Sequence, residues 1–256
     1  MSPSGARRRV LAANWKMNLG PTDARAFMAA FLASYSPKSD RTVLIFPPAL
    51  SLTSVRDALG GRRDVQLGVQ NIHTEPKGAF TGESSAAMAK DAGAHYALVG
   101  HSERRHVFGE TDEATARKVA LAVQTGLTAM LCIGEKWEER ERGHTDDVVL
   151  RQLRAGVSLI DSETRRKLMI AYEPVWAIGT GKTATPADAS AVHAVIRREL
   201  ATLCGSEANA ADVPVLYGGS VNKDNARSLL DARDVDGLLV GGASLDASGW
   251  SAIAST

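Results

Sequence analysis

Cysteine is scarce in this sequence. Its 256 residues include only two cysteines, Cys132 and Cys204, which lie far apart and fit no metal-ligand spacing. A disulfide framework and a cysteine metal site are therefore excluded as organising features of the fold. We expect two reduced thiols and a cytoplasmic location.

Long apolar runs are missing as well. No stretch approaches the ~20 residues that a membrane-spanning helix needs. The start, Met1–Arg9, is basic, but Asn14 and Lys16 interrupt the apolar Val10–Ala13 before it reaches the length of a signal-peptide core. We expect a short, solvated lead-in to a first strand and no membrane partner.

The sequence also lacks an excess of charge of either sign, because its formal net charge is only +1. This balance gives no basic footprint for nucleic acid, so an anionic substrate would have to be bound by local groups. The composition, 44% hydrophobic and 23% charged, supplies enough apolar material for a sizeable core. The length fits one α/β barrel of about 250 residues, and we predict a single domain over residues 1–256.

Short apolar runs alternate with longer segments of helical period. Eight runs are predicted strands: Val10–Ala13, Thr42–Phe46, Val65–Val69, Tyr96–Val99, Thr128–Ile133, Leu168–Tyr172, Val215–Tyr217 and Gly237–Val240. The clearest predicted helices are Pro21–Ala33, Asp112–Thr125, Asp146–Leu159, Pro186–Leu203 and Asn222–Leu230. Thr111 and Thr185 are suitable N-caps for two of them. We interpret the charged run Trp137–Arg142 as a solvated helical face.

The pattern predicts the α/β class and a (β/α)8 barrel. Near-continuous apolar strands suit a parallel sheet that is covered on both faces. A doubly wound open sheet is the alternative. Eight strands favour the closed barrel, and no dinucleotide-binding glycine fingerprint follows the first strand.

Polar residues directly follow five of the predicted strands. They are Asn14-Trp15-Lys16, Gly100-His101-Ser102-Glu103, Glu173-Pro174, Gly218-Gly219-Ser220 and Gly241-Gly242. Each has an ordinary structural explanation when taken alone. In a barrel, however, the carboxyl ends of the strands share one face, which carries the active site. A carboxylate, an imidazole, an ammonium and two glycine-rich anion sites together suit proton transfer beside a carbonyl in a phosphorylated substrate.

Longer segments of this sequence resemble those of triosephosphate isomerases. The resemblance rests on six segments: Asn14–Asn18, Gly78–Glu83, Gly100–Arg105, Leu131–Glu135, Ala171–Gly181 and Tyr217–Val221. It extends in order from about Val10 to about Leu245. It implies an aldose–ketose isomerase that interconverts glyceraldehyde 3-phosphate and dihydroxyacetone phosphate, in glycolysis and gluconeogenesis, without metal or cofactor.

The resemblance also implies the roles of individual residues. Glu173 is similar to the general base, and His101 to the neutral imidazole that polarises the carbonyl. A helix beginning at Ser102 would hold the pKa of His101 down. Lys16 is similar to the cation that binds the substrate and stabilises the enediolate. Glu103 is similar to a buried carboxylate that partners the lysine.

The substrate-binding set and the lid follow from the same resemblance. The substrate-binding residues are Asn14, Lys16, Gly179, Ser220, Gly241 and Gly242. The lid comprises Pro174, Val175, Trp176, Ala177, Ile178, Gly179, Thr180, Gly181, Lys182, Thr183 and Ala184. Closure of such a lid would exclude water from the reaction.

A homodimer is the expected assembly. The segment Gly78–Glu83 has an apolar tip and resembles the family segment that inserts into a partner subunit. The residues implied in this interface are Phe80, Thr81, Gly82, Glu83 and Arg104, with Glu83 expected to meet Arg104 of the other chain. His95 lies upstream of a strand, and we interpret it as structural.

Three other functions remain open at this point. Gly181-Lys182-Thr183 imitates the end of a nucleotide-binding P-loop, but that motif needs a glycine where Trp176 stands. An aldolase would use Lys16 as a Schiff-base nucleophile, which borohydride trapping would detect. A non-catalytic barrel would have no need of Glu173.

Overall fold

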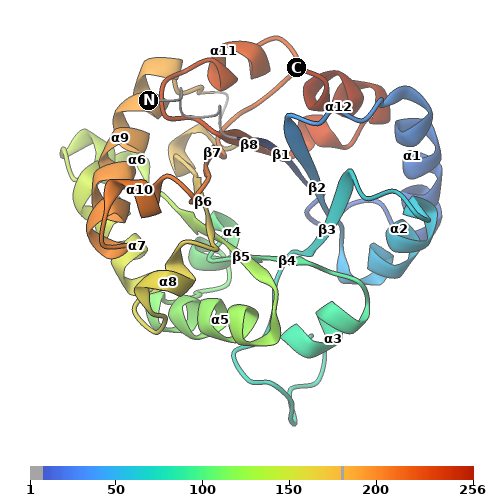
Figure 1. Ribbon diagram of the computed structural model, residues 1–256, viewed down its shortest axis with the longest axis horizontal. Coiled ribbons are helices and arrows are strands. Elements are labelled where there is room, and N and C mark those ends of the chain that lie inside the picture. The colour runs from blue at the N-terminus through green and yellow to red at the C-terminus, as the bar shows by residue number, and fades with distance from the viewer. Residues whose placement is uncertain (1–7, 180–181) are drawn as a thin grey trace.

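The computed structural model describes residues 8–179 and 182–256, and its centre is a closed parallel barrel (Figure 1). The strands follow one another in chain order around it, and β1 closes the barrel against β8. They are β1 (Arg9–Asn14), β2 (Arg41–Phe46), β3 (Val65–Val69), β4 (Tyr96–Val99), β5 (Thr128–Ile133), β6 (Met169–Tyr172), β7 (Val215–Tyr217) and β8 (Gly237–Val240). The predicted (β/α)8 barrel is confirmed, and the open sheet is excluded.

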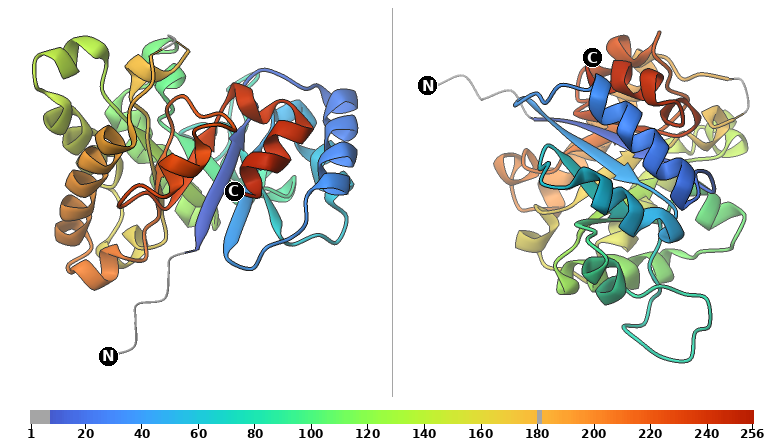
Figure 2. Two further views of the ribbon diagram at one scale, coloured as in Figure 1. Left: turned by 90° about the horizontal axis from the view of Figure 1, so that it is seen from above. Right: turned by 90° about the vertical axis from the view of Figure 1, so that its right-hand side faces the viewer.

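Helices surround the barrel on its outside (Figures 1 and 2). The α-helices are α1 (Pro21–Ser34), α2 (Leu52–Leu59), α3 (Ala86–Asp91), α4 (Ser102–His106), α5 (Asp112–Thr125), α6 (Trp137–Glu141), α7 (Thr145–Gly156), α8 (Ser162–Arg165), α9 (Pro186–Leu203), α10 (Glu207–Ala210), α11 (Ala226–Leu230) and α12 (Ala247–Ala254). The short 3₁₀ helices within the described ranges are η1 (Ala49–Ser51), η2 (Val175–Ala177) and η3 (Gly242–Ser244). No helix in the described ranges is long and apolar enough to cross a membrane.

The predicted N-caps of α5 and α9 are confirmed. The hydroxyl of Thr111 accepts the N–H of Ala114, and that of Thr185 accepts the N–H of Asp188, each at 3.1 Å. The predicted helix Asn222–Leu230 is wrong at its start, since α11 begins only at Ala226. The Asn222 side chain accepts the N–H groups of Asp224 and Asn225, which holds these residues in a turn instead.

Side chains of the strands alternate between two cores. In β1, Val10 and Ala12 point into the barrel, whereas Leu11 and Ala13 face the surrounding helices. The barrel interior is filled by Val10, Ala12, Leu44, Phe46, Leu98, Met130, Cys132, Ala171, Leu216 and Leu239. The barrel is thus a packed core, and its open end presents the residues that follow the strands.

Gly134 is required where β5 and β6 end. A Cβ atom at this position would lie 1.7 Å from the carbonyl oxygen of Glu173, a backbone atom that cannot rotate away. The N–H of Glu173 also donates to the carbonyl of Ile133 at 2.8 Å. This close approach fixes the backbone of Glu173 at the rim of the barrel.

His193 is a fully buried histidine on α9. Its Nδ1 lies 3.0 Å from the carbonyl oxygen of Asp234 and donates to it, so Nδ1 carries a proton. Burial lowers the pKa of His193 to about 4. The unfolded chain therefore binds more protons than the folded one between about pH 4 and the ordinary value of 6.5.

We predict that stability falls as the pH drops through this window. The loss assigned to His193 should approach roughly 3 kcal/mol at the acid end and vanish above pH 7. Urea unfolding at several pH values, at one protein concentration, would measure it. His193→Asn keeps an amide donor near Asp234 but does not titrate, so its curve should be flatter by that amount. Parallel pH curves for the two proteins would contradict the assignment.

Candidate active site

A pocket of about 280 Å³ opens at the carboxyl ends of the strands. It is lined by Asn14, Lys16, His101, Glu173, Ile178, Gly179, Gly218, Gly219, Ser220, Val221, Leu239, Gly241, Gly242 and Ala243. All the residues expected to act on or bind the substrate are therefore brought together. They come from five different strand ends, which the closed barrel places around one mouth.

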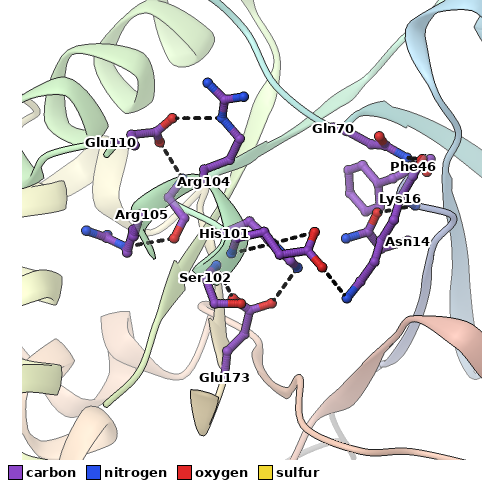
Figure 3. Close-up of polar contacts among 12 residues, drawn as sticks. Asn14, Lys16, Phe46, Gln70, His101, Ser102, Arg104, Arg105, Glu110 and Glu173 are labelled. Carbon is purple, nitrogen blue, oxygen red and sulfur yellow. Dashed lines mark hydrogen bonds and ion pairs between the residues drawn. The ribbon is translucent and has the colours of Figure 1, made fainter. Parts of the chain in front are cut away.

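Glu173 is the most buried charged group of the pocket, with 2% of its surface exposed. One carboxylate oxygen accepts the N–H of Ser102 at 2.8 Å, and the other lies 3.0 Å from Nε2 of His101 (Figure 3). Burial alone would raise the pKa of Glu173, but His101 and the Ser102 N–H outweigh it and hold the pKa below its ordinary value. The carboxylate is therefore ionised.

The hydrogen bonds of His101 define its tautomer. Nδ1 accepts the N–H of Glu103 at 3.2 Å, so this nitrogen carries no proton. Nε2 then carries the hydrogen and donates it to Glu173. His101 is thus a neutral donor whose Nε2–H points into the pocket.

The expected direction of the His101 pKa is wrong for this arrangement. Burial works to lower the pKa of His101, as the start of α4 was expected to do, but the adjacent Glu173 carboxylate raises it above its ordinary value. The pKa of His101 is raised because the Glu173 carboxylate lies 3.0 Å from its Nε2. When that carboxylate moves away, burial and the Glu103 N–H remain, and both favour the neutral ring.

Lys16 has an unusual backbone for a residue with a side chain, since its φ of 50° lies in the left-handed region. Its N–H donates to Oδ1 of Asn14 at 3.0 Å. Nε2 of Gln70, just beyond β3, donates to the carbonyl oxygens of Lys16 and Phe46, both at 2.8 Å. These bonds hold the strained turn that aims the ammonium at the pocket.

The ammonium of Lys16 pairs with Glu103, as expected. Nζ lies 2.7 Å from Oε1 of Glu103. The expectation that Glu103 is buried is wrong for the single chain, because 45% of its side chain is exposed. Glu103 stands on the first turn of α4 and faces a second hollow of about 230 Å³, which Met17 and Phe108 also line.

The glycine-rich ends of β7 and β8 supply backbone donors. The N–H groups of Ser220 and Gly242 form no backbone hydrogen bond within the described ranges. Gly242 begins η3, so its N–H points out of the first turn. Gly241 packs against the Lys16 side chain, since an added Cβ would lie 3.3 Å from Cε. This end of the pocket is suited to an anion.

The predicted lid begins directly after Glu173 and ends two residues before α9. Ile178 and Gly179 line the pocket, and η2 is fixed to the buried carboxylate of Glu135. Oε1 of Glu135 accepts Nε1–H of Trp176 at 2.9 Å, and both its oxygens lie 3.1 Å from the hydroxyl of Tyr172. The predicted lid residues Thr180 and Gly181 lie outside the described residues.

The predicted dimer loop stands out from the body of the barrel (Figures 1 and 2). Its base is tied by the N–H of His73, which donates to the carbonyl of Ser84 at 2.9 Å. Phe80 packs on the ring of His73 at 4.1 Å between centroids and is 42% exposed. Arg104, expected to meet Glu83 of another chain, donates to Glu110 at 3.4 Å within this one.

Comparisons with known proteins agree with this geometry. The family model of triosephosphate isomerase matches residues 9–256. The chain belongs to the triosephosphate isomerase family. The family's protein from Herpetosiphon aurantiacus is 49% identical over 241 residues, which cover 94% of this chain and 96% of that protein. The family's protein from Symbiobacterium thermophilum is 48% identical over 247 residues, and these cover 96% of each chain.

The sequence does not predict the roles of two polar residues in this triosephosphate isomerase fold, Gln70 and Glu135. Gln70 has a detectable signal, because it directly follows β3 as the predicted site residues follow their strands. Glu135 lies in a segment that resembles the family, but the sequence gives it no partner. Among the residues that the structure describes, no group of three or more His, Cys, Asp or Glu could hold a metal ion.

We predict that Gln70→Met lowers kcat/KM about tenfold. The change removes two donors and leaves the strained Lys16 turn without support, at a cost of about 1 kcal/mol for each lost bond. Gln66→Met is the matched control, since Gln66 is a partly buried glutamine on β3 that bonds to the nearby Arg63 carbonyl. Steady-state kinetics would compare them. Equal activity in both variants would show that Gln70 does not position Lys16.

Proposed function

We propose that the chain interconverts glyceraldehyde 3-phosphate and dihydroxyacetone phosphate by moving a proton between two neighbouring carbons. The observation that carries this proposal is the contact between Glu173 and His101 at the mouth of the barrel. A buried, ionised carboxylate and a neutral imidazole donor are the base and the electrophile that such a transfer needs. Membership of the triosephosphate isomerase family supports the same reaction.

In this structure Glu173 and His101 are hydrogen-bonded to each other, so neither group is available to a substrate. Glu173 accepts from His101 and Ser102, while Nε2–H of His101 has no other acceptor in these bonds. We infer that a substrate carbonyl takes the place of the carboxylate at Nε2. The Glu173 side chain then turns toward the substrate carbon, while its backbone stays fixed against β5.

Proton transfer follows from these positions. Glu173 removes a proton from the carbon beside the carbonyl, and the electron pair forms an enediolate. His101 and the Lys16 ammonium stabilise the negative charge on its oxygen atoms. Glu173 returns the proton to the neighbouring carbon. The hydroxyl proton of the enediolate passes from one oxygen to the other by way of Nε2 of His101, which gives up one proton and takes up the other, so atoms and charge balance over the cycle.

The phosphate is assigned to the opposite end of the pocket. Gly179, Ser220, Gly241 and Gly242 lie there, and the backbone N–H groups of Ser220 and Gly242 are available as donors. Asn14 and Lys16 lie between this end and His101. The barrel fold places a phosphate site after strands seven and eight, which supports this orientation.

We predict that Glu173→Gln lowers kcat by roughly 10²–10⁴, the usual contribution of a positioned general base. The amide is nearly the same size, so the fold should survive, which circular dichroism would check. Glu163→Gln on the distant helix α8 serves as the control and should retain full activity. A coupled assay with glyceraldehyde 3-phosphate measures both variants. If Glu173→Gln keeps more than about a third of the kcat, another group is the base.

We further propose a homodimer in which the loop Gly78–Glu83 enters the second hollow of a partner chain. The hollow is bordered by Met17 and Phe108, whose exposures of 95% and 66% are high for apolar residues. The half-exposed Glu103 lies in the same place, so docking there would bury the Lys16–Glu103 pair. An isologous contact would repeat this at two sites.

We also propose a cytoplasmic location, which the two free, buried cysteines support.

We predict that Thr81→Arg produces monomers and lowers kcat by roughly tenfold or more, because an arginine at the loop tip would not fit the hollow beside Lys16. Thr202→Arg, at another exposed threonine on α9, is the control and should stay dimeric. Sedimentation gives the mass, and the coupled assay gives the rate. A monomeric unsubstituted protein would overturn the dimer. A fully active Thr81→Arg monomer would overturn the contribution of the loop to the partner's site, and both outcomes leave the isomerase assignment intact.

A further inference from the structure

Helix α6 is a small surface element beside the lid. Its five residues, Trp137–Glu141, include none that is buried, and the sequence suggests only a solvated face. The helix begins two residues after Glu135, the carboxylate that holds η2. Its position therefore places Trp137 and Arg140 next to both ends of the lid.

The first end of the lid contacts α6 through Trp176. The indole rings of Trp137 and Trp176 lie 5.6 Å apart between centroids, tilted by 60°. The guanidinium of Arg140 lies over the Trp176 ring at 4.7 Å. Both side chains pack against a ring whose Nε1–H is already bound by Glu135.

The second end of the lid and the start of α9 contact α6 through two cationic pairs. Nζ of Lys182 lies 3.5 Å from the centroid of the Trp137 ring. Nη2 of Arg140 donates to Asp188 at 2.6 Å, and Asp188 also accepts the N–H of Thr185 at the start of α9. Trp137 is thus in contact with both sides of the lid, at Trp176 and at Lys182.

These contacts coexist with the resting position of Glu173. The carboxylate is bonded to Ser102 and His101, away from the position it needs over a substrate carbon. Trp176 lies three residues after Glu173 in the chain. Contacts that hold Trp176 and Lys182 in this arrangement therefore stabilise the lid position in which Glu173 is bonded to Ser102 and His101.

We propose that Trp137 is a positioning residue for the lid. Through its contact with Lys182, it stabilises the lid position that accompanies the Glu173–His101 contact. It thereby sets how much of a ligand's binding energy is consumed when the lid closes. The proposal rests on the isomerase function proposed above and extends it to a residue outside the pocket. Trp137 touches no reacting atom, so it acts on the lid equilibrium alone.

The size of the effect follows from the exposure of the pair. Trp137 is 36% exposed, and Lys182 is on the surface. A cation–π contact at such a site changes an equilibrium constant by roughly 2- to 5-fold. A ligand that binds only the closed lid should gain that factor when the contact is removed.

The test uses Trp137→Leu and Lys182→Met in the full-length protein. Trp137→Leu keeps an apolar side chain, whereas Lys182→Met keeps the stem and removes the charge. The probe is 2-phosphoglycolate, a phosphorylated carboxylate whose shape and charge resemble an enediolate, and calorimetry gives its Kd. We expect each variant to bind it roughly 2- to 5-fold more tightly, with a lower KM. The double variant should equal either single one, because both remove the same contact.

Two conservative variants separate this role from simple packing. Trp137→Phe keeps a ring face and Lys182→Arg keeps a cation, so both should return the Kd toward that of the unsubstituted protein. An unchanged or weaker Kd in Trp137→Leu, or effects that multiply in the double variant, would overturn the proposal. If Trp137→Leu does not fold, Lys182→Met against Lys182→Arg decides the question by the same criterion.

The outcomes distinguish this inference from the proposed function. If the unsubstituted protein neither isomerises glyceraldehyde 3-phosphate nor binds 2-phosphoglycolate, the proposed function has failed. If it does both and the Trp137 variants match it, only the lid inference has failed.

Discussion

The site depends on one buried ion, the carboxylate of Glu173. Removing a carboxylate from water is costly unless donors replace the lost hydration. Here the donors are the Ser102 N–H at the start of α4 and Nε2–H of His101. The same two bonds keep the base ionised and keep it away from the substrate position. The bonds that stabilise the buried carboxylate therefore also hold it in an unreactive position. Substrate binding must separate Glu173 from His101 before the reaction can occur.

Several features far apart in the sequence exist to hold this arrangement. Gly134 gives the Glu173 backbone room to approach β5, and the helix start of α4 supplies the N–H that Glu173 accepts. Gln70 supports the strained turn at Lys16 from a third strand. Because each support comes from a different strand end, the closed barrel is the element that makes them meet.

Much of this could be predicted from the sequence for a simple physical reason. Strands buried on both faces are continuous apolar runs, so their ends are visible, and in a parallel barrel those ends share one face. That reasoning located Lys16, His101 and Glu173 together. It could not give the pKa direction of His101, which depends on where the Glu173 side chain rests. Nor could it give the bonds of Gln70, whose partners lie 54 and 24 residues away.

The base and the lid are joined by the chain itself. The N–H of Glu173 is bonded to the end of β5, and the N–H of Val175, two residues later, donates to the carbonyl of Glu135 at 3.0 Å. The backbone between them is thus held at both points to one β5–α6 segment. Glu173 can leave its resting position by side-chain rotation, whereas movement of the lid changes its contacts with Glu135 and α6. Residues on α6 therefore act on the lid without displacing the backbone of the base, so this surface can vary while the position of the Glu173 backbone is preserved.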